Sequence, residues 1–554
     1  MDMPWIREYS AGVPASIDLD PDESVLDLVD RAVARFADRP AFSNLGRTIT
    51  FRELDDASRR LAAWLHALPG VVPGDRVAIM LPNLLQYPVA LLGVWRAGLV
   101  VVNVNPMYTA PELEHQLNDS GAKVLLVFAQ SAGTYVDVRS RVGVRHVLVT
   151  GAGDMLGFPR GPIVNFALRF LRHKPARHVP GAFHWSVIAG CKPLAAVPSP
   201  PKGGDLACLQ YTGGTTGRSR GAMLTHANLV ANVHQVNTWF AAKTVPGQEM
   251  MVAPLPLYHI YALTCNCLCY IDVGGHGILI TDPRDLKAFV AELKRWKFTA
   301  ITGVNTLYQA LVDCPGIKDV DFSSLKLASA GGMSVMPATA RAWKELTGIM
   351  LHEGYGLSET SPVVTTNPVT QAEYNGSIGL PMPNTLVSLR DGDTEVPVGE
   401  PGEICVKGPQ VTRGYWNDEA GTAAAMTPDG FFRTGDIATM DEHGYFRIVD
   451  RKKDMIDVSG LKVYPNEVEA AITNHPAVVE AACIGVPDER TGEAVKVFLV
   501  LKPGHTLTLE EMRSFLKGSL AAYKIPRQLE IRDSLPKSNV GKILRRKLRE
   551  PAAG

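Results

Sequence analysis

The chain has 554 residues, and its 56 Lys plus Arg are matched by 56 Asp plus Glu, so it carries no formal net charge at pH 7. A chain of this length is too long for one hydrophobic core, so two or more domains are expected. The balanced charge excludes a global attraction to nucleic acid or to acidic surfaces and leaves such binding to local patches.

Cysteine usage and the apolar segments bear on the compartment. The eight cysteines are too few for a disulfide framework in so long a chain, which favours a reducing compartment. Cys265, Cys267 and Cys269 are spaced too closely for a typical zinc site and fit an apolar buried segment better. The first ten residues lack the features of a signal peptide, and the apolar stretch at 255–275 is too interrupted for a membrane span. The sequence therefore predicts a cytoplasmic protein.

Strand-like and helical segments alternate over the first part of the chain. Strand-like apolar runs lie at 76–81, 123–128 and 146–150. Helical patterns cover 24–37 and 87–98. This alternation predicts parallel sheets covered by helices.

The same alternation repeats after the glycine-rich segment at 211–221. A strand is expected just before this segment, and a helix over 226–239 just after it, with Thr225 as its N-cap. Short apolar runs that end in Gly or small residues follow at 298–304, 325–332 and 349–356. Ligands of α/β proteins bind where such strands end, so we expect the functional site there.

The pattern changes after about residue 380. The runs at 402–410 and 494–502 are typical of antiparallel strands joined by Gly-rich turns, and the charged stretch at 449–460 is interpreted as a linker. Helices with capping signals are expected within 464–476 and 508–526. The sequence thus predicts a large N-terminal part of about 450 residues and an α+β domain of about 100.

The segment at 211–221, YTGGTTGRSRG, has the residue types of a phosphate-binding loop. Its glycines let backbone N–H groups approach an anion closely, and its threonines and arginines add further donors. It is not a Walker A loop, because counting from Gly213 puts Arg218 at the motif's second glycine and no lysine follows it, which argues against a P-loop ATPase. These residues alone leave open a Gly/Thr-rich surface turn.

Four more segments accompany this loop in a known order. Together they resemble the adenylate-forming superfamily of acyl-CoA synthetases, luciferases and peptide-synthetase adenylation domains. The segments resemble that family's adenine and magnesium motif, ribose motif, hinge region and C-terminal lysine motif, and they lie at 355–360, 433–437, 450–469 and 536–549. Over nearly its full length the chain is most similar to bacterial long-chain fatty acyl-CoA synthetases.

The resemblance implies an α/β fold with three parts. Residues 1–449 are expected to form a large N-terminal domain of helix-covered sheets with a β-barrel-like subdomain. Residues 450–455 are expected to form a hinge linker, and residues 456–554 a small mobile C-terminal α+β domain.

The resemblance also implies an activity. A long-chain fatty acid is activated by ATP to acyl-AMP with release of pyrophosphate, and coenzyme A then takes the acyl group, with Mg²⁺ as the metal ion. Three alternatives stay open. They are a fatty acyl-AMP ligase that serves a carrier protein, a medium-chain or aryl acyl-CoA synthetase, and a non-catalytic acyl- or nucleotide-binding protein.

Five side chains carry the chemistry implied by the resemblance. Lys542 would bridge the substrate carboxylate and the α-phosphate, Glu359 would hold Mg²⁺ together with Thr215, and Arg451 would support the ribose and phosphates. Lys453 occupies the hinge position. Three of them have a plainer alternative: a solvated tail lysine for Lys542, a linker cation for Arg451 and an ordinary loop residue for Glu359.

The resemblance extends to the substrate contacts. Tyr355 would stack on adenine and Asp436 would accept hydrogen bonds from the ribose hydroxyls. Ser219 and Arg220 stand where the family commonly has Pro and Lys, so the role of that lysine does not transfer. The expected ATP- and AMP-binding set is Thr212, Gly213, Gly214, Thr215, Thr216, Gly217, Arg220, Gly331, Gly332, Gly354, Tyr355, Gly356, Ser358, Asp436, Arg451 and Lys542. The expected acyl and CoA contacts are His259, Gly303, Val304 and Gly460.

The segment at 163–178 mixes large apolar residues with Arg and Lys. This composition is typical of an amphipathic helix at a membrane surface, which predicts peripheral contact on the inner face of the membrane. A helix packed on its own domain is the alternative. The expected partners are the fatty acid, ATP and coenzyme A, without nucleic acid, and a homodimer stays open.

Overall fold

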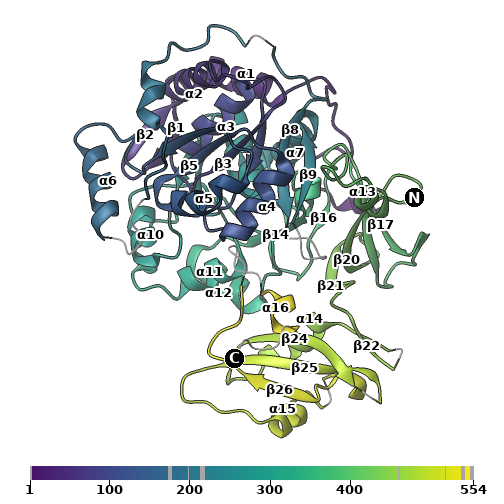
Figure 1. Cartoon of the computed structure of the whole chain (residues 1–554). Helices are drawn as coiled ribbons and strands as arrows, with labels where there is room; N and C mark the ends of the chain where they lie inside the picture. The colour runs from purple at the N-terminus through teal and green to yellow at the C-terminus, as the bar shows by residue number, and fades with distance from the viewer. Residues whose placement is uncertain are drawn as a thin grey trace.

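The computed structural model describes residues 3–171, 177–197, 199–212, 219–459, 461–488, 490–517, 519–537 and 543–549. In these parts of the chain, four β-sheets form a large body and a smaller one below it (Figure 1). The predicted α/β fold with a large N-terminal domain and a small C-terminal α+β domain is confirmed.

The first large sheet has seven strands in the order β7-β6-β5-β3-β4-β8-β9. All neighbours run parallel except the β8–β9 pair, which is antiparallel. The strands are β3 (Arg76–Met80), β4 (Val100–Asn103), β5 (Val124–Phe128), β6 (His146–Thr150), β7 (Phe183–His184), β8 (Leu206–Thr212) and β9 (Arg220–Thr225).

The second large sheet has nine strands in the order β16-β15-β14-β13-β12-β10-β11-β1-β2. Its central strands are parallel, so the carboxyl ends of β12, β13 and β14 lie along one edge, where α/β proteins bind ligands. The strands are β1 (Pro40–Asn44), β2 (Arg47–Thr50), β10 (Met250–Ala253), β11 (His276–Leu279), β12 (Ala300–Gly303), β13 (Leu327–Ala330), β14 (Leu351–Gly356), β15 (Val363–Thr366) and β16 (Leu380–Pro381).

Helices form layers around these two sheets. One core joins the inner faces of both sheets with α1 (Val25–Phe36), α2 (Phe51–His66), α3 (Gln86–Arg96) and α7 (His226–Trp239). Every residue of α3 is buried, which explains why its sequence is apolar almost throughout. The outer face of the seven-stranded sheet packs on α4 (Ala110–Ser120) and α5 (Ala132–Val138). The outer face of the nine-stranded sheet packs on α10 (Leu286–Leu293), α11 (Asn305–Val312) and α12 (Pro337–Thr347).

The helix starts follow from local capping. Thr225 accepts a hydrogen bond from the Asn228 backbone, and the Asn228 side chain bonds back to it in a capping box, which confirms the predicted N-cap of α7. The apolar run with three cysteines forms α8 (Ile260–Ala262), a π-helix (Leu263–Leu268) and α9 (Cys269–Asp272). No helix of the described chain is both long and apolar enough to cross a bilayer.

The predicted β-barrel-like subdomain is a five-stranded antiparallel sheet in the order β18-β17-β19-β20-β21. Its inner side chains join the large core, and α13 (Glu419–Ala425) packs beside β20. The strands are β17 (Leu386–Asp391), β18 (Thr394–Glu395), β19 (Gly402–Lys407), β20 (Phe432–Met440) and β21 (Phe446–Arg451).

The C-terminal domain has its own sheet and its own core. The sheet order is β23-β22-β25-β24, with β26 paired to β25, and α14 (Pro465–Thr473) packs on β24. The other elements are β22 (Ile456–Val458), β23 (Leu461–Val463), β24 (Val478–Asp488), β25 (Gly492–Leu501), α15 (Leu509–Leu516), β26 (Gln528–Ile531) and α16 (Arg545–Arg549).

Two sequence expectations need correction. The charged stretch at 449–460 is a linker only between β21 and β22, because alternate side chains of its ends are buried in two different sheets. The helix expected within 508–526 ends at Leu516, and only a short 3₁₀ turn, Ala522–Lys524, follows it. The capping signal at Thr508 was local and correct, whereas the end of the helix depends on packing.

Candidate active site

A cavity of about 2280 Å³ lies between the nine-stranded sheet, the five-stranded sheet and the C-terminal domain. Its walls include the ends of β13 and β14, strands β20 and β21, helix α14 and residues just before and in α16. A pocket for one small ligand usually has roughly 300–1,000 Å³, so this cavity has room for more than one substrate.

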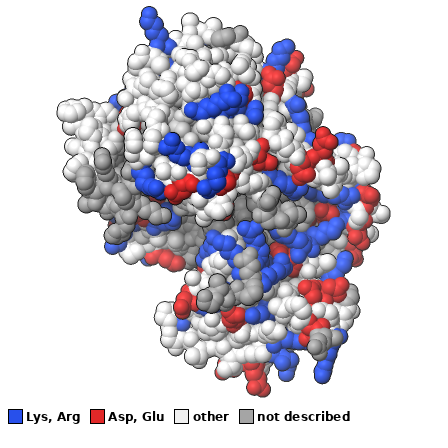
Figure 2. All heavy atoms as spheres, in the orientation of Figure 1, with Lys and Arg blue, Asp and Glu red and all other residues white. Residues whose placement is uncertain are grey.

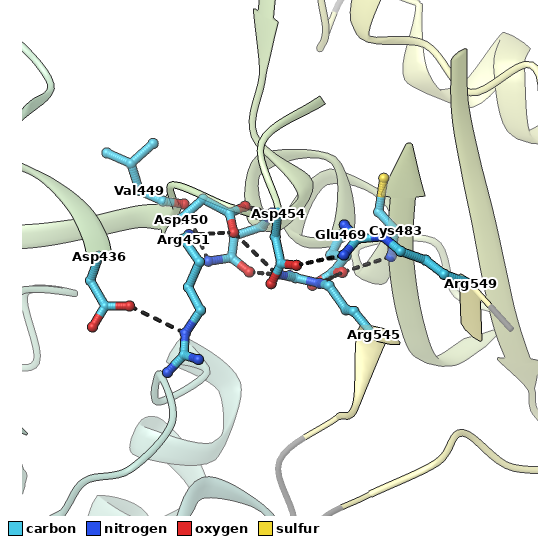
Figure 3. Close-up of polar contacts among 10 residues, drawn as sticks. Asp436, Val449, Asp450, Arg451, Asp454, Glu469, Cys483, Arg545 and Arg549 are labelled. Atoms are coloured by element: carbon cyan, nitrogen blue, oxygen red, sulfur yellow. Dashed lines mark hydrogen bonds and ion pairs between the residues drawn. The ribbon is translucent and has the colours of Figure 1, made fainter. Parts of the chain in front are cut away.

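A hydrogen-bonded group from three strands forms one wall. The register of β20 and β21 places Asp436 opposite Arg451, and Arg451 Nε lies 3.2 Å from Asp436 Oδ1 (Figure 3). Tyr355, near the end of β14, donates its hydroxyl to Asp436 Oδ2 at 2.7 Å. Burial and the neighbouring carboxylate raise the pKa of Tyr355 well above its usual value, so its hydroxyl stays a donor. The three predicted residues therefore lie together.

A buried carboxylate forms another part of the wall. Glu359 lies in the 3₁₀ turn Ser358–Thr360, and its Oε1 accepts a hydrogen bond from Tyr415 Oη at 2.8 Å. Burial raises the pKa of Glu359 despite that donor. The guanidinium of Arg220 stacks 3.9 Å from the centre of the Tyr415 ring, with Nη1 3.6 Å from Asp418 Oδ2.

Arg220 keeps an unused donor. Its Nε is buried and has no hydrogen-bond partner among the described residues. Because a buried guanidinium nitrogen without a partner is costly, the site is suited to an anionic ligand at this point. This residue lies near the end of the glycine-rich segment 211–221, so the observation agrees with phosphate binding there.

Two glycines are required by close approach or backbone conformation. A Cβ on Gly356 would lie 1.9 Å from the carbonyl oxygen of Pro362, so no larger residue fits that strand end. Gly332 has φ +78°, a left-handed conformation that favours glycine, in the loop after β13. Gly331, Gly354 and Ser358 also line the cavity.

One part of the cavity wall, the apolar branch, is formed mainly by apolar side chains of α7, the π-helix region and nearby strands. Of the expected acyl contacts, His259 and Val304 line the cavity, whereas Gly303 does not. Gly303 instead packs on Tyr308, whose ring would lie 2.8 Å from an added Cβ. His259 caps α8, and burial lowers its pKa to about 4, so it is neutral. Other side chains of this branch are Phe240, Met251, Leu255, Tyr261, Cys265 and Cys269.

An ion-pair network ties the C-terminal domain to β21 and to the segment after it (Figure 3). Arg545 of α16 contacts Asp450 Oδ1 at 3.1 Å and Glu469 Oε2 at 2.8 Å. Asp454 lies 3.5 Å from Arg545 and 3.2 Å from Arg549. The expected hinge residue, Lys453, lines the cavity beside this network, and burial lowers its pKa.

Several expected site residues lie outside the described chain: Gly213, Gly214, Thr215, Thr216, Gly217, Gly460 and Lys542. Their described neighbours do reach the cavity. Thr212 and Arg220 line it on either side of the glycine-rich loop, and Ile543 lines it directly after Lys542.

Sequence reasoning missed several contributors. Tyr415 orients Glu359, and Arg545 binds three carboxylates, yet neither lies near its partners in the sequence. Both residues lie in segments that resemble the family, but the residues around them in the sequence do not predict which side chains they contact. Lys and Arg also gather where the two bodies meet (Figure 2). The basic side chains that line the cavity there are Arg433, Arg451, Lys452, Lys453, Lys537, Arg545, Arg546 and Arg549.

Comparison with known proteins gives two family matches. Residues 29–416 match the AMP-binding enzyme family, and residues 467–542 match the AMP-binding enzyme C-terminal domain.

Individual relatives cover nearly the whole chain. A long-chain-fatty-acid–CoA ligase of Escherichia coli O6:H1 is 50% identical over 99% of this chain and 98% of its own. A ligase of the same name from Haemophilus influenzae is 46% identical over 99% and 98%. Among solved structures, ATP-bound MatB from Rhodopseudomonas palustris is 30% identical, with a TM-score of 0.82 over 95% of this chain and 98% of that one.

Proposed function

The chain belongs to the AMP-binding enzyme family, and we propose that it is a ligase that activates a long-chain fatty acid with ATP and transfers it to coenzyme A. The observation that carries this proposal is the likeness, at half of all positions and over the full length, to long-chain-fatty-acid–CoA ligases. The size of the cavity and its mainly apolar branch agree with it.

The reaction has two steps. A fatty carboxylate oxygen attacks the α-phosphorus of ATP, an acyl–phosphate anhydride bond forms, and the bond to the β-phosphate breaks to release pyrophosphate. The sulfur of coenzyme A then attacks the acyl carbon, a thioester forms, the thiol proton is lost, and AMP leaves. In the first step the site must hold the two anions in line and neutralise the charge on the phosphate oxygens.

The Asp436 wall supplies nucleotide binding. The two oxygens of a carboxylate can accept from two neighbouring hydroxyls, so Asp436 is suited to a ribose, with Arg451 and Tyr355 fixing its orientation. Tyr355 also presents an aromatic ring to the cavity for adenine. Arg220 offers its Nε, which has no partner among the described residues, to a phosphate oxygen.

The Glu359 wall fits Mg²⁺. Mg²⁺ is usually bound through one or two carboxylates together with substrate phosphates, and it neutralises phosphate charge when bound. Tyr415 donates to Oε1 of Glu359, which leaves Oε2 for a cation. Thr215 would add its hydroxyl, as the family resemblance implies.

Lys542 would neutralise charge between the carboxylate and the α-phosphate. Its neighbour Ile543 lines the cavity, so the conformation seen here agrees with the adenylating step. For the second step, rotation at Lys453 within the hinge 450–455 would move residues 456–554 and bring the Gly460 region to the cavity.

Helix α6 (Arg160–Leu171) supports a peripheral membrane contact. Phe158 is 91% exposed, Ile163 62% and Phe166 66%, and the helix lies at the outer edge of the large body (Figure 1). Residues 172–176 of the segment 163–178 lie outside the described chain. Exposed apolar side chains flanked by Arg residues are suited to an anionic membrane surface.

The function is tested with a panel of acids from acetate to oleate and an aryl acid. We expect AMP release that requires both coenzyme A and a fatty acid, with long chains preferred. AMP release with an aryl acid alone would favour an aryl acyl-CoA synthetase, and acyl-AMP that accumulates despite coenzyme A would favour an acyl-AMP ligase. ADP as the product, or ATP consumption without any acid, would contradict the proposal.

A further inference from the structure

A buried glutamate two residues before Tyr355 makes an unusual set of contacts. Glu353 of β14 is 3% exposed, and its Oε1 accepts a hydrogen bond from the Val335 backbone N–H at 3.2 Å. Its Oε2 lies 2.7 Å from Tyr374 Oη. Tyr374 Oη also lies 2.7 Å from the carbonyl oxygen of Val335. Glu353, Tyr374 and both backbone groups of Val335 thus form one closed ring.

The ring needs one more proton than an ionised glutamate offers. Tyr374 has a single hydroxyl proton, yet Oη lies at hydrogen-bonding distance from two acceptors, the Val335 carbonyl and Glu353 Oε2. A carbonyl oxygen cannot donate, so Tyr374 donates to Val335. The second contact is then a hydrogen bond only if Glu353 carries a proton and donates to Tyr374. In that state each of the three contacts of the ring is a hydrogen bond with one donor and one acceptor.

The surroundings favour the protonated form. The neighbouring strands β13 and β15 and the loop at 331–336 contain no charged residue. Burial raises the pKa of Glu353 to about 7, although hydrogen bonds donated to the ionised carboxylate by Tyr374 and the Val335 N–H would act in the opposite direction. Burial and the Glu353 carboxyl together raise the pKa of Tyr374, so the phenol is not the acid.

Other titratable groups nearby have different partners. Burial lowers the pKa of His352 to about 4, so it is neutral, and its ring packs on Phe240. The charge of Arg447 in β21 acts to lower the pKa of Tyr374, and Arg447 donates to the Asn375 carbonyl. On α12, Lys344 pairs with Glu373, and Arg341 and Glu345 are exposed.

We propose that Glu353 works as an un-ionised carboxylic acid that fixes the β13–α12 loop, residues 331–336, as the wall of the nucleotide site. The loop carries Gly331 and Gly332, and next to Val335 its end is also held by Asn305, whose Oδ1 accepts from the Met336 N–H at 2.8 Å. Glu353 is thus a positioning residue. The kinetic part of this proposal rests on the proposed function, whereas the protonation of Glu353 does not.

The proton is tested by infrared spectroscopy of Glu353→Gln against the unmodified protein. Glutamine retains both contacts, because its amide donates to Tyr374 and its carbonyl accepts from Val335. We expect the carbonyl band of an un-ionised carboxylic acid in the unmodified protein, its loss in Glu353→Gln, and its retention in the control Glu345→Gln. Other buried carboxyls cancel in the difference between proteins. The absence of such a difference band at about pH 6 would overturn the proposal.

Stability gives a second readout. A carboxyl whose folded pKa is raised from 4.5 to about 7 contributes stability that is complete below the lower value and is lost as the pH rises through the higher one. The melting temperature of Glu353→Gln relative to the unmodified protein should therefore rise between about pH 5 and about pH 8. Glu345→Gln should show no such trend, and parallel curves for all three proteins would contradict the proposal.

Kinetics test the positioning role. Glu353→Ala should raise the KM for ATP roughly tenfold with a smaller change in kcat, because it frees the loop without removing a reacting group. Glu353→Gln should have the KM of the unmodified protein near neutral pH. In the unmodified protein, ionisation of Glu353 should raise the KM for ATP at alkaline pH, and Glu353→Gln should lack this increase. An unchanged KM in Glu353→Ala would refute the positioning role even if the infrared result held. Loss of all acid-dependent AMP release in the unmodified protein would instead refute the proposed function.

Discussion

At the scale of single residues, this site places charged groups where water is excluded, so each depends on one or two named neighbours. Glu359 has Tyr415 as its hydroxyl donor, and Asp436 has Tyr355 and Arg451. A charge in such a place is costly unless it is hydrogen-bonded. The supporting side chains therefore matter as much as the ones that contact the substrates.

Tyr415→Phe tests this dependence. Removing a hydrogen bond to a buried charged group costs about 1.5–3 kcal/mol, so Glu359 should become harder to ionise and bind the cation more weakly. We expect the Mg²⁺ concentration for half-maximal AMP release to rise roughly tenfold or more. The measurement is a Mg²⁺ titration at saturating ATP.

A matched control for this prediction is Tyr523→Phe, which removes a phenol hydroxyl from the C-terminal domain away from the cavity. Its Mg²⁺ dependence should equal that of the unmodified protein. Equal curves for Tyr415→Phe would mean that Glu359 does not hold the cation.

At the scale of elements, most helices are explained by burial of one face, whereas α6 leaves large apolar side chains in water. Phe158, just before α6, and Ile163 and Phe166, within it, are exposed, and the sequence that follows the helix is basic. An exposed apolar surface of this kind commonly marks an interaction site.

The double substitution Ile163→Asp with Phe166→Asp tests the membrane contact. Aspartate removes apolar contact and adds repulsion from anionic lipid, so the vesicle-bound fraction should fall several-fold in flotation with anionic phospholipid vesicles. AMP release with a short, water-soluble acid should not change. Val72→Asp, at a residue that is 56% exposed elsewhere, is the control. Equal flotation of all three proteins would count against α6 as the contact.

At the scale of the whole molecule, the two bodies are joined by ion pairs across the expected hinge. Asp450 is fully buried. It lies before the hinge residue Lys453 in the chain, whereas its partners Asn466 and Arg545 lie after Lys453. Asp450 Oδ2 accepts from the Asn466 N–H at 2.6 Å, and Oδ1 pairs with Arg545. Rotation at Lys453 would separate these groups, so they stabilise the conformation seen here.

Asp450→Asn therefore should favour the other conformation. Arg545 keeps Glu469 and Asp454, so we estimate a loss of about 1–2 kcal/mol, less than for breaking an isolated buried pair. Fatty acid-dependent ATP–pyrophosphate exchange should fall roughly tenfold, while thioester formation from supplied acyl-AMP should hold or rise.

Lys542→Ala is the comparison for Asp450→Asn. It should abolish exchange and leave thioester formation from acyl-AMP largely intact, because it removes the charge without altering the ion pairs. If Asp450→Asn lowered both half-reactions equally, the ion pairs would be ordinary stabilising contacts and not specific to one conformation.

The sequence by itself determined the helix-covered sheets, the cap of α7 at Thr225 and the family. These features depend on residues within a few positions of one another, on hydrophobic periodicity and on ordered motifs. The order of the motifs also identified Glu359, Tyr355 and Asp436, which the structure brings to one cavity. It could not say which side chains hold them.

Only the tertiary structure decided those partnerships. Tyr415 and Glu359 lie 56 residues apart, Tyr374 and Glu353 lie 21 apart, and Arg545 and Asp450 lie 95 apart. Contacts at such separations follow from sheet register and from how the domains pack. Burial in turn sets the protonation of a group such as Glu353. Neither quantity is a property of a short stretch of chain, which is why a motif can name a site residue without revealing its electrostatic environment.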